Sequence, residues 1–187
     1  MIPALAGALP GAEFEIAANG TAYSARIEIE ETDAYIFSEP GILGEPVPSR
    51  VSGIRLEAPN GTVVPIREQG SGVITFPEGN YTLSFEGELG TPHLQHFFDA
   101  AHRANVTVPA GLNVTNPFLG GYSPGADLTV KPDGTTRLSW DSTGEVRVRF
   151  YDAAREAMLW FFASTWAVVA IVLLFPFLFD RLNRHRE

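Results

Sequence analysis

The chain contains no cysteine, and only one of its 13 basic residues is a lysine. The lack of cysteine excludes disulfides, thiol chemistry and a lipid attached through sulfur, so any folded domain must be held by packing alone. Twelve arginines against the single Lys131 indicate a compositional bias rather than a guanidinium-specific site. The sequence also lacks a Ser-His-Asp order, a phosphate-cradling glycine loop and a His-Glu-x-x-His helix. We therefore predict no enzymatic activity and no cofactor.

Positive charge is scarce over most of the chain. Three of the 13 basic residues and two of the 22 acidic residues follow Met158, which leaves 10 basic against 20 acidic residues before it. An excess of about ten negative charges repels phosphate backbones, so nucleic acid is excluded as a partner.

One long uncharged run, residues 157–179, stands near the C-terminus. Its 23 residues would reach about 34 Å as a helix, enough for a hydrocarbon core of about 30 Å. Arg181, Arg184 and Arg186 follow in the short tail 180–187, and the positive-inside rule assigns such a tail to the cytoplasm. The sequence thus predicts a single-pass protein of the cell membrane, with the lipid bilayer as partner and the N-terminal domain outside.

Residues 1–11 are small and apolar, with alanine spacing typical of a signal-peptide cleavage site but no positive n-region. We interpret them as the remnant of a signal peptide. The alternative is that the C-terminal span alone directs insertion.

Residues 12–152 show the two-residue alternation of β-strands. It is clearest in residues 23–30, 81–86 and 146–151, and no helical period interrupts it. Further predicted strands are 13–17, 34–37, 51–58, 62–66, 72–76, 94–98, 105–108, 127–130 and 136–140. So many strands predict two packed sheets, an extracytoplasmic β-sandwich of immunoglobulin-like or transthyretin-like layout.

Turn residues divide this pattern into hairpins. Asn60-Gly61 and Asp133-Gly134 tolerate the positive φ of tight primed turns and predict one hairpin each. A third turn, residues 141–144, is predicted to link the strand holding Trp140 to the last strand.

Five Asn-x-Thr sequons lie in the predicted outer domain, mostly at expected turns or strand ends, and are candidates for glycosylation: Asn19, Asn60, Asn80, Asn105 and Asn113. Structural turns are the alternative explanation for each of them.

Two clusters of titratable residues invite a metal hypothesis. His93, His96 and Asp99 precede a third histidine, His102, but their spacing does not bring the four side chains to one face of a helix or a strand. The acidic stretch Glu28, Glu30, Glu31 and Asp33 lacks the pattern of a calcium loop. We therefore predict no metal site and interpret both clusters as strand residues.

Two segments are candidates for contact with a partner. In the loop 118–125, the pair Gly120-Gly121 and Pro124 fix the backbone, and the loop could present Phe118, Leu119 and Tyr122. An architectural crossover is the alternative. Within the apolar run, Ala163 and Ala167 have the small-xxx-small spacing that lets helices approach closely. A passive anchor, in which Ser164 and Thr165 bond back to their own helix, is the alternative.

Residues 105–125, the Leu138-Ser-Trp-Asp141 segment and the last strand before an apolar run together resemble an archaeal family of surface proteins of unknown function. The segment Pro59-Asn-Gly-Thr-Val-Val64 is also similar. The resemblance implies an archaeal cell-surface setting, where N-glycosylation is plausible, and it assigns no catalytic residue.

These observations favour a membrane-anchored β-sandwich domain with a structural or protein-binding role at the archaeal cell surface, contacting envelope proteins. The main alternative is an accessory subunit of a larger transport or secretion complex, which the transmembrane helix contacts. A hydrolase or metal enzyme using His93, His96 and Asp99 is the third hypothesis.

Overall fold

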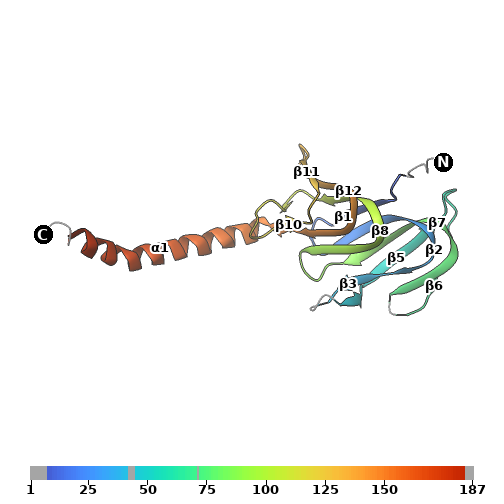
Figure 1. Cartoon of the computed structure of the whole chain (residues 1–187), viewed down its shortest axis with the longest axis horizontal. Coiled ribbons are helices and arrows are strands. Elements are labelled where there is room, and N and C mark those ends of the chain that lie inside the picture. Colours follow the sequence, from blue (N-terminus) through green and yellow to red (C-terminus); the bar gives the residue numbers. More distant parts are fainter. Residues whose placement is uncertain (1–7, 42–44, 71, 184–187) are drawn as a thin grey trace, which may run out of the picture. The chain divides into compact units, whose positions relative to one another are not determined.

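A computed structural model describes residues 8–41, 45–70 and 72–183 of the 187-residue chain. The chain divides into two compact units, Met1–Tyr151 and Asp152–Glu187. The first is built of β-strands and the second is a helix (Figure 1). An all-β domain followed by one helix of membrane-spanning length is thus confirmed.

In the described residues up to Asp152 there are thirteen strands. Their bounds are β1 Gly11–Ile16, β2 Ala22–Ile36, β3 Ser38–Pro40, β4 Pro46–Pro48, β5 Val51–Glu57, β6 Arg67–Glu68, β7 Val73–Glu88, β8 His93–Val108, β9 Leu112–Asn113, β10 Gly121–Tyr122, β11 Asp127–Val130, β12 Thr136–Arg149 and β13 Tyr151–Asp152. Nine of them form one sheet in the order β10-β12-β8-β1-β2-β7-β5, with β11 beside β12 and β6 beside β7. The short pairs β3-β4 and β9-β13 complete the pairing.

The sandwich arises because four long strands, β2, β7, β8 and β12, bend and contribute to both layers. Their pairing register shifts between Ile29 and Thr32 of β2 and between Trp140 and Glu145 of β12, as β-bulges do where a strand bends. The predicted strands 72–76 and 81–86 therefore belong to the two halves of β7, and 94–98 and 105–108 to the two halves of β8. The predicted turn 141–144 is likewise wrong, because β12 continues through it.

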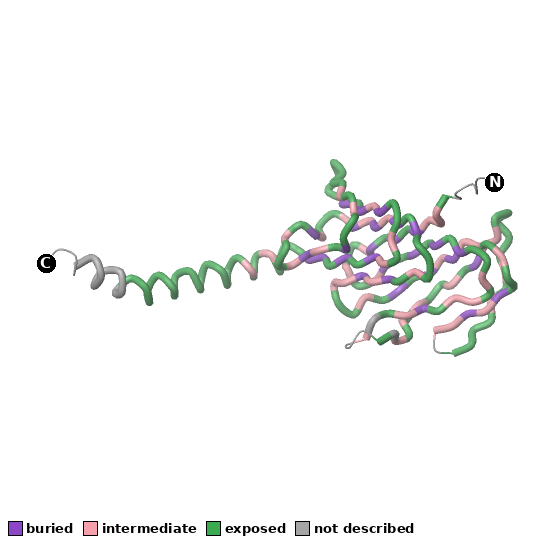
Figure 2. The backbone as a smooth tube through the Cα atoms, viewed as in Figure 1, coloured by how far each residue is buried: buried purple, intermediate pink, exposed green. Residues whose placement is uncertain are grey.

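The core lies between the two layers, where buried and exposed residues alternate along much of β1 and the long strands (Figure 2). Phe14 of β1 packs against His96, from the first half of β8, with ring centroids 5.2 Å apart. Phe37 meets Phe85 of β7 at 4.9 Å in an edge-to-face contact. These aromatic contacts join one layer to the other.

The two predicted hairpin turns are present, but their geometry differs from that expected. Gly61 and Gly134 have φ of 80° and 84°, whereas Asn60 and Asp133 do not adopt positive φ. Each turn therefore resembles a type I turn followed by a left-handed glycine rather than a primed turn. After Asn60-Gly61 the predicted strand 62–66 is reduced to one bridge, Glu57 to Val63.

The second unit contains the helix α1, Ala153–Asn183. Asp152 caps its first turn, since the carboxylate accepts the backbone N–H of Arg155 at 2.8 Å. The uncharged run 157–179 lies wholly within α1, and the part from Ala153 to Phe175 is long and apolar enough to cross a membrane. In the tail, residues 180–183 continue α1, whereas 184–187 lie outside the described residues, as do residues 1–7 of the predicted signal remnant.

Candidate functional site

The loop 113–123 runs from the end of β9 through the short strand β10. Asparagine side chains fix the first half of this loop. The Asn113 carboxamide oxygen accepts the backbone N–H groups of Val114 and Thr115, at 2.8 and 3.1 Å. Asn116 bonds in the same way to the N–H of Phe118, at 3.0 Å. The N–H of Asn116 itself donates to the Tyr151 hydroxyl at 3.2 Å. Such local bonds fix the turn without help from regular secondary structure.

The middle of the loop is fixed by a close approach and by an arginine. Gly120 is buried, and a Cβ there would lie 2.6 Å from the backbone oxygen of Val114, so only glycine fits. The Arg149 guanidinium donates to the carbonyl of Gly120 at 3.0 Å and reaches that of Pro117 at 3.5 Å. The predicted backbone constraint thus comes from lack of space rather than from positive φ.

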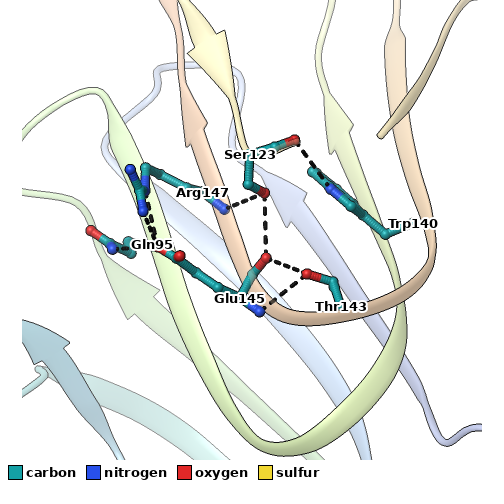
Figure 3. A network of polar contacts seen from close by, with 6 residues as sticks. All are labelled: Gln95, Ser123, Trp140, Thr143, Glu145 and Arg147. Carbon is teal, nitrogen blue, oxygen red and sulfur yellow. Dashed lines mark hydrogen bonds and ion pairs between the residues drawn. The ribbon is translucent and has the colours of Figure 1, made fainter. Parts of the chain in front are cut away.

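The end of the loop is held by a polar network around Ser123 (Figure 3). The Trp140 indole N–H donates to the Ser123 carbonyl at 3.3 Å, and the Ser123 hydroxyl donates to the carbonyl of Glu145 at 3.3 Å. The Glu145 carboxylate accepts bonds from Gln95 at 2.7 Å and from Arg147 at 2.7 Å. The loop and the Leu-x-Trp-Asp segment are separate motifs in the sequence. In the structure, one hydrogen-bond network joins them.

The result is a rigid loop that presents an aromatic side chain. Phe118 is 79% exposed, the highest value among the large apolar side chains described in the β unit. Tyr122, on β10, is 41% exposed, whereas Leu119 is half-buried. Two of the three predicted contact residues are thus available to a partner.

The loop lies at the end of the β unit where the chain leaves the last long strand. Phe150 donates its N–H to the Pro92 carbonyl at 3.0 Å, and its ring lies close to Gly20. Leu89 in turn bonds to the Thr21 carbonyl at 2.8 Å. We call this the exit end, formed by residues 17–22, 89–92 and 109–122 around Phe150 and Tyr151. Sequence reasoning missed it because the three segments are far apart in the chain.

The five sequons occupy different settings. Asn19 and Asn60 are exposed in turns, and Asn113 is exposed at the end of β9. Each of these side chains accepts the N–H of its own sequon threonine. Asn80 lies within β7 and accepts the Glu31 N–H at 2.9 Å, and half-buried Asn105 lies within β8 and accepts from Arg137 at 3.3 Å. Asn80 and Asn105 are therefore strand residues, whereas most of the sequons were expected at turns or strand ends.

The histidine cluster of β8 is part of the core. His96 is 6% exposed, and its Nε2 lies 2.9 Å from the Tyr35 hydroxyl. Burial, with a smaller contribution from nearby His102, lowers the pKa of His96 to about 4. Burial also raises the pKa of Tyr35, so this hydrogen bond joins a neutral phenol to a neutral imidazole. His93 is half-buried and Asp99 is exposed.

Neither titratable cluster forms a metal centre. Over residues 8–41, 45–70 and 72–183, no group of three His, Cys, Asp or Glu side chains is placed to hold an ion. Glu28 and Glu30 lie on the exposed face of β2, as the alternation predicts, and the Glu28 carboxylate accepts the Gly11 N–H at 2.6 Å. The outer face of the central strands has two open, polar hollows of about 420 and 490 Å³, which share Glu13, Arg26 and Asn105.

On α1, Ala163 and Ala167 are both exposed, as the pairing hypothesis requires. The hydroxyls of Ser164 and Thr165 donate to the carbonyl of Phe161, at 2.9 and 2.8 Å. These hydroxyls therefore bond back to their own helix.

The chain is thus a β-sandwich protein with one C-terminal helix suited to a membrane. Its sequence matches a family of unknown function, DUF5803, over residues 11–186, and the chain belongs to that family. No curated protein matches it.

Proposed function

We propose that this chain is a membrane-anchored, non-enzymatic surface protein, whose β-sandwich lies outside the cell and has a structural or protein-binding role in an archaeal envelope. The observation that carries the proposal is α1, whose 23-residue segment Ala153–Phe175 contains an 18-residue window with a mean hydropathy of 2.3. Its large apolar side chains, such as Trp160, Val168 and Leu173, are exposed and need a lipid environment.

The orientation follows from the arginines of the tail, and the lack of cysteine makes it testable. In intact cells, Val63→Cys should react with a membrane-impermeant maleimide, because Val63 is 54% exposed in the β unit. Glu187→Cys should react only after the membrane is opened. The reverse pattern of labelling would contradict an outer domain.

The alternative, an accessory subunit of a transport or secretion complex, makes a different demand on α1. Such a subunit would contact its complex through the face of Ala163 and Ala167, so replacing both by leucine should release it. Val168→Leu with Val172→Leu, on another face, is the matched control. We favour the anchor, because Ser164 and Thr165 already have partners within the helix. Crosslinked complexes that survive in the control and disappear in the alanine variant would support the accessory subunit.

A further inference from the structure

The three segments of the exit end carry no charge, and exposed Glu88 and Asp152 flank them on β7 and β13. None of the residues 17–22, 89–92 and 109–122 is Asp, Glu, Lys, Arg or His, although 19% of the chain is charged. Arg149, which reaches this end from β12, is bonded to loop carbonyls. Moving such a surface out of bulk water therefore leaves few charged groups without hydration.

The opposite end of the same strands is acidic. There the long strands bend, and the bends carry the exposed residues Glu30, Glu31, Asp33, Glu78, Asp99 and Asp141. These six carboxylates of the β unit thus lie away from the point where the chain departs, whereas Glu88 and Asp152 lie near it. This distribution suits a domain whose exit end approaches a surface that disfavours added negative charge.

Chain connectivity keeps the exit end close to any membrane that α1 crosses. Tyr151, which bonds to the loop through Asn116, is six positions before Ala157, where the uncharged run begins. Six residues reach about 20 Å when fully extended and about 9 Å in a helix. Tyr151 therefore lies within about 20 Å of the start of the uncharged run, a distance that permits the exit end to contact the bilayer surface.

From these three observations we infer that the exit end is a second membrane contact, at which Phe118 enters the interfacial layer of the bilayer and Tyr122 lies at its edge. The inference rests on the proposed anchoring by α1. Aromatic side chains are favoured at this depth, and the bonds that fix the loop keep the entropy lost on contact small. We assign a lipid surface rather than a protein as the partner of the exit end, because α1 in the membrane keeps the loop near the bilayer.

The test uses spin labels on single cysteines in the full chain, reconstituted in phosphatidylcholine vesicles. Thr115→Cys places a label in the loop, Val63→Cys places one away from the exit end, and Val168→Cys places one in α1. Collision rates with oxygen and with a water-soluble nickel complex report the depth of each label. We expect the oxygen-to-nickel ratio at 115 to be several-fold above that at 63 and below that at 168.

A variant pair assigns the effect to Phe118. In the Thr115→Cys background, Phe118→Ser should lower the ratio toward the aqueous value, whereas Phe97→Ser, which removes a half-exposed phenylalanine elsewhere, should leave it unchanged. Equal ratios at 115 and 63, with a lipid value at 168, would overturn the inference and leave the anchor standing. An aqueous value at 168 would instead refute the anchor, and with it the inference.

Discussion

Gly120 fits its place in the loop 113–123 only because it has no side chain. We predict that Gly120→Ala destabilises the β unit by about 1 to 3 kcal/mol, since the added Cβ would meet the backbone of Val114 and the loop would have to shift. Gly121→Ala is the matched control, because its Cβ would meet nothing within 4 Å. Denaturant unfolding of the full chain in detergent measures both. Equal losses in the two variants would contradict the close approach.

His96 makes the stability of the β unit depend on pH. Its folded pKa of about 4 lies below the ordinary 6.5, so the unfolded chain binds a proton that the folded chain excludes. The contribution is fully present above pH 6.5 and is lost as the pH falls toward 4, by at most about 3 kcal/mol. His93, whose pKa burial also lowers, acts in the same direction.

The variant His96→Gln isolates this effect from that of the carboxylates. Glutamine cannot be protonated in this range, yet it can accept the Tyr35 hydroxyl. We expect its cost in unfolding free energy to be largest at pH 7.5 and to shrink as the pH falls to 4.5. A cost that does not change with pH would show that His96 titrates normally.

At the scale of elements, the bend of β2 depends on one strained residue. Glu31 has φ of 50°, and its N–H is accepted by Asn80. A left-handed conformation costs a residue with a side chain about 1 kcal/mol, so Glu31→Gly should stabilise the protein or leave it unchanged. Glu30→Gly, in the strand itself, should destabilise it by about 1 kcal/mol. Glu30→Gly should therefore unfold at a lower temperature than the natural protein, and Glu31→Gly should not.

The bends also explain which parts of the fold the sequence could predict. Alternation identifies the faces of a strand locally, so the buried positions of 23–29 and 146–150 were predicted correctly. It cannot tell a bulge from a turn, because both interrupt the period, and the segments 77–80 and 141–144 contain the glycine, proline or aspartate typical of turns. The halves of β7, β8 and β12 therefore read as separate strands.

The candidate site was predictable only in part, for a similar reason. Phe118 and Tyr122 stand out in the sequence because glycines and prolines surround them. The bonds from Tyr151, Arg149 and Trp140 that make the loop rigid join residues at least 17 positions apart and leave no local pattern. The exit end depends on segments brought together only by the register of the long strands.

At the scale of the whole molecule, the negative charge of the β unit should oppose the contact of its exit end with an anionic membrane. The chain has a formal net charge of −9, and the domain before the helix is more acidic still. Salt screens such repulsion, and the screening length falls from about 30 Å at 0.01 M salt to about 10 Å at 0.1 M. The acidic bends are distant from the exit end, so they act on the lipid only at low salt.

We therefore predict that the lipid contact of the loop is salt-dependent in vesicles containing phosphatidylglycerol. The label at Thr115→Cys should read as more aqueous at 0.01 M salt than at 0.15 M, by a few-fold in the oxygen-to-nickel ratio. In vesicles of phosphatidylcholine alone, salt should have little effect. The label at Val168→Cys should not respond in either vesicle, because the anchor depends on hydrocarbon rather than on charge. A salt response in neutral vesicles would mean that electrostatics within the protein, not the lipid charge, positions the loop.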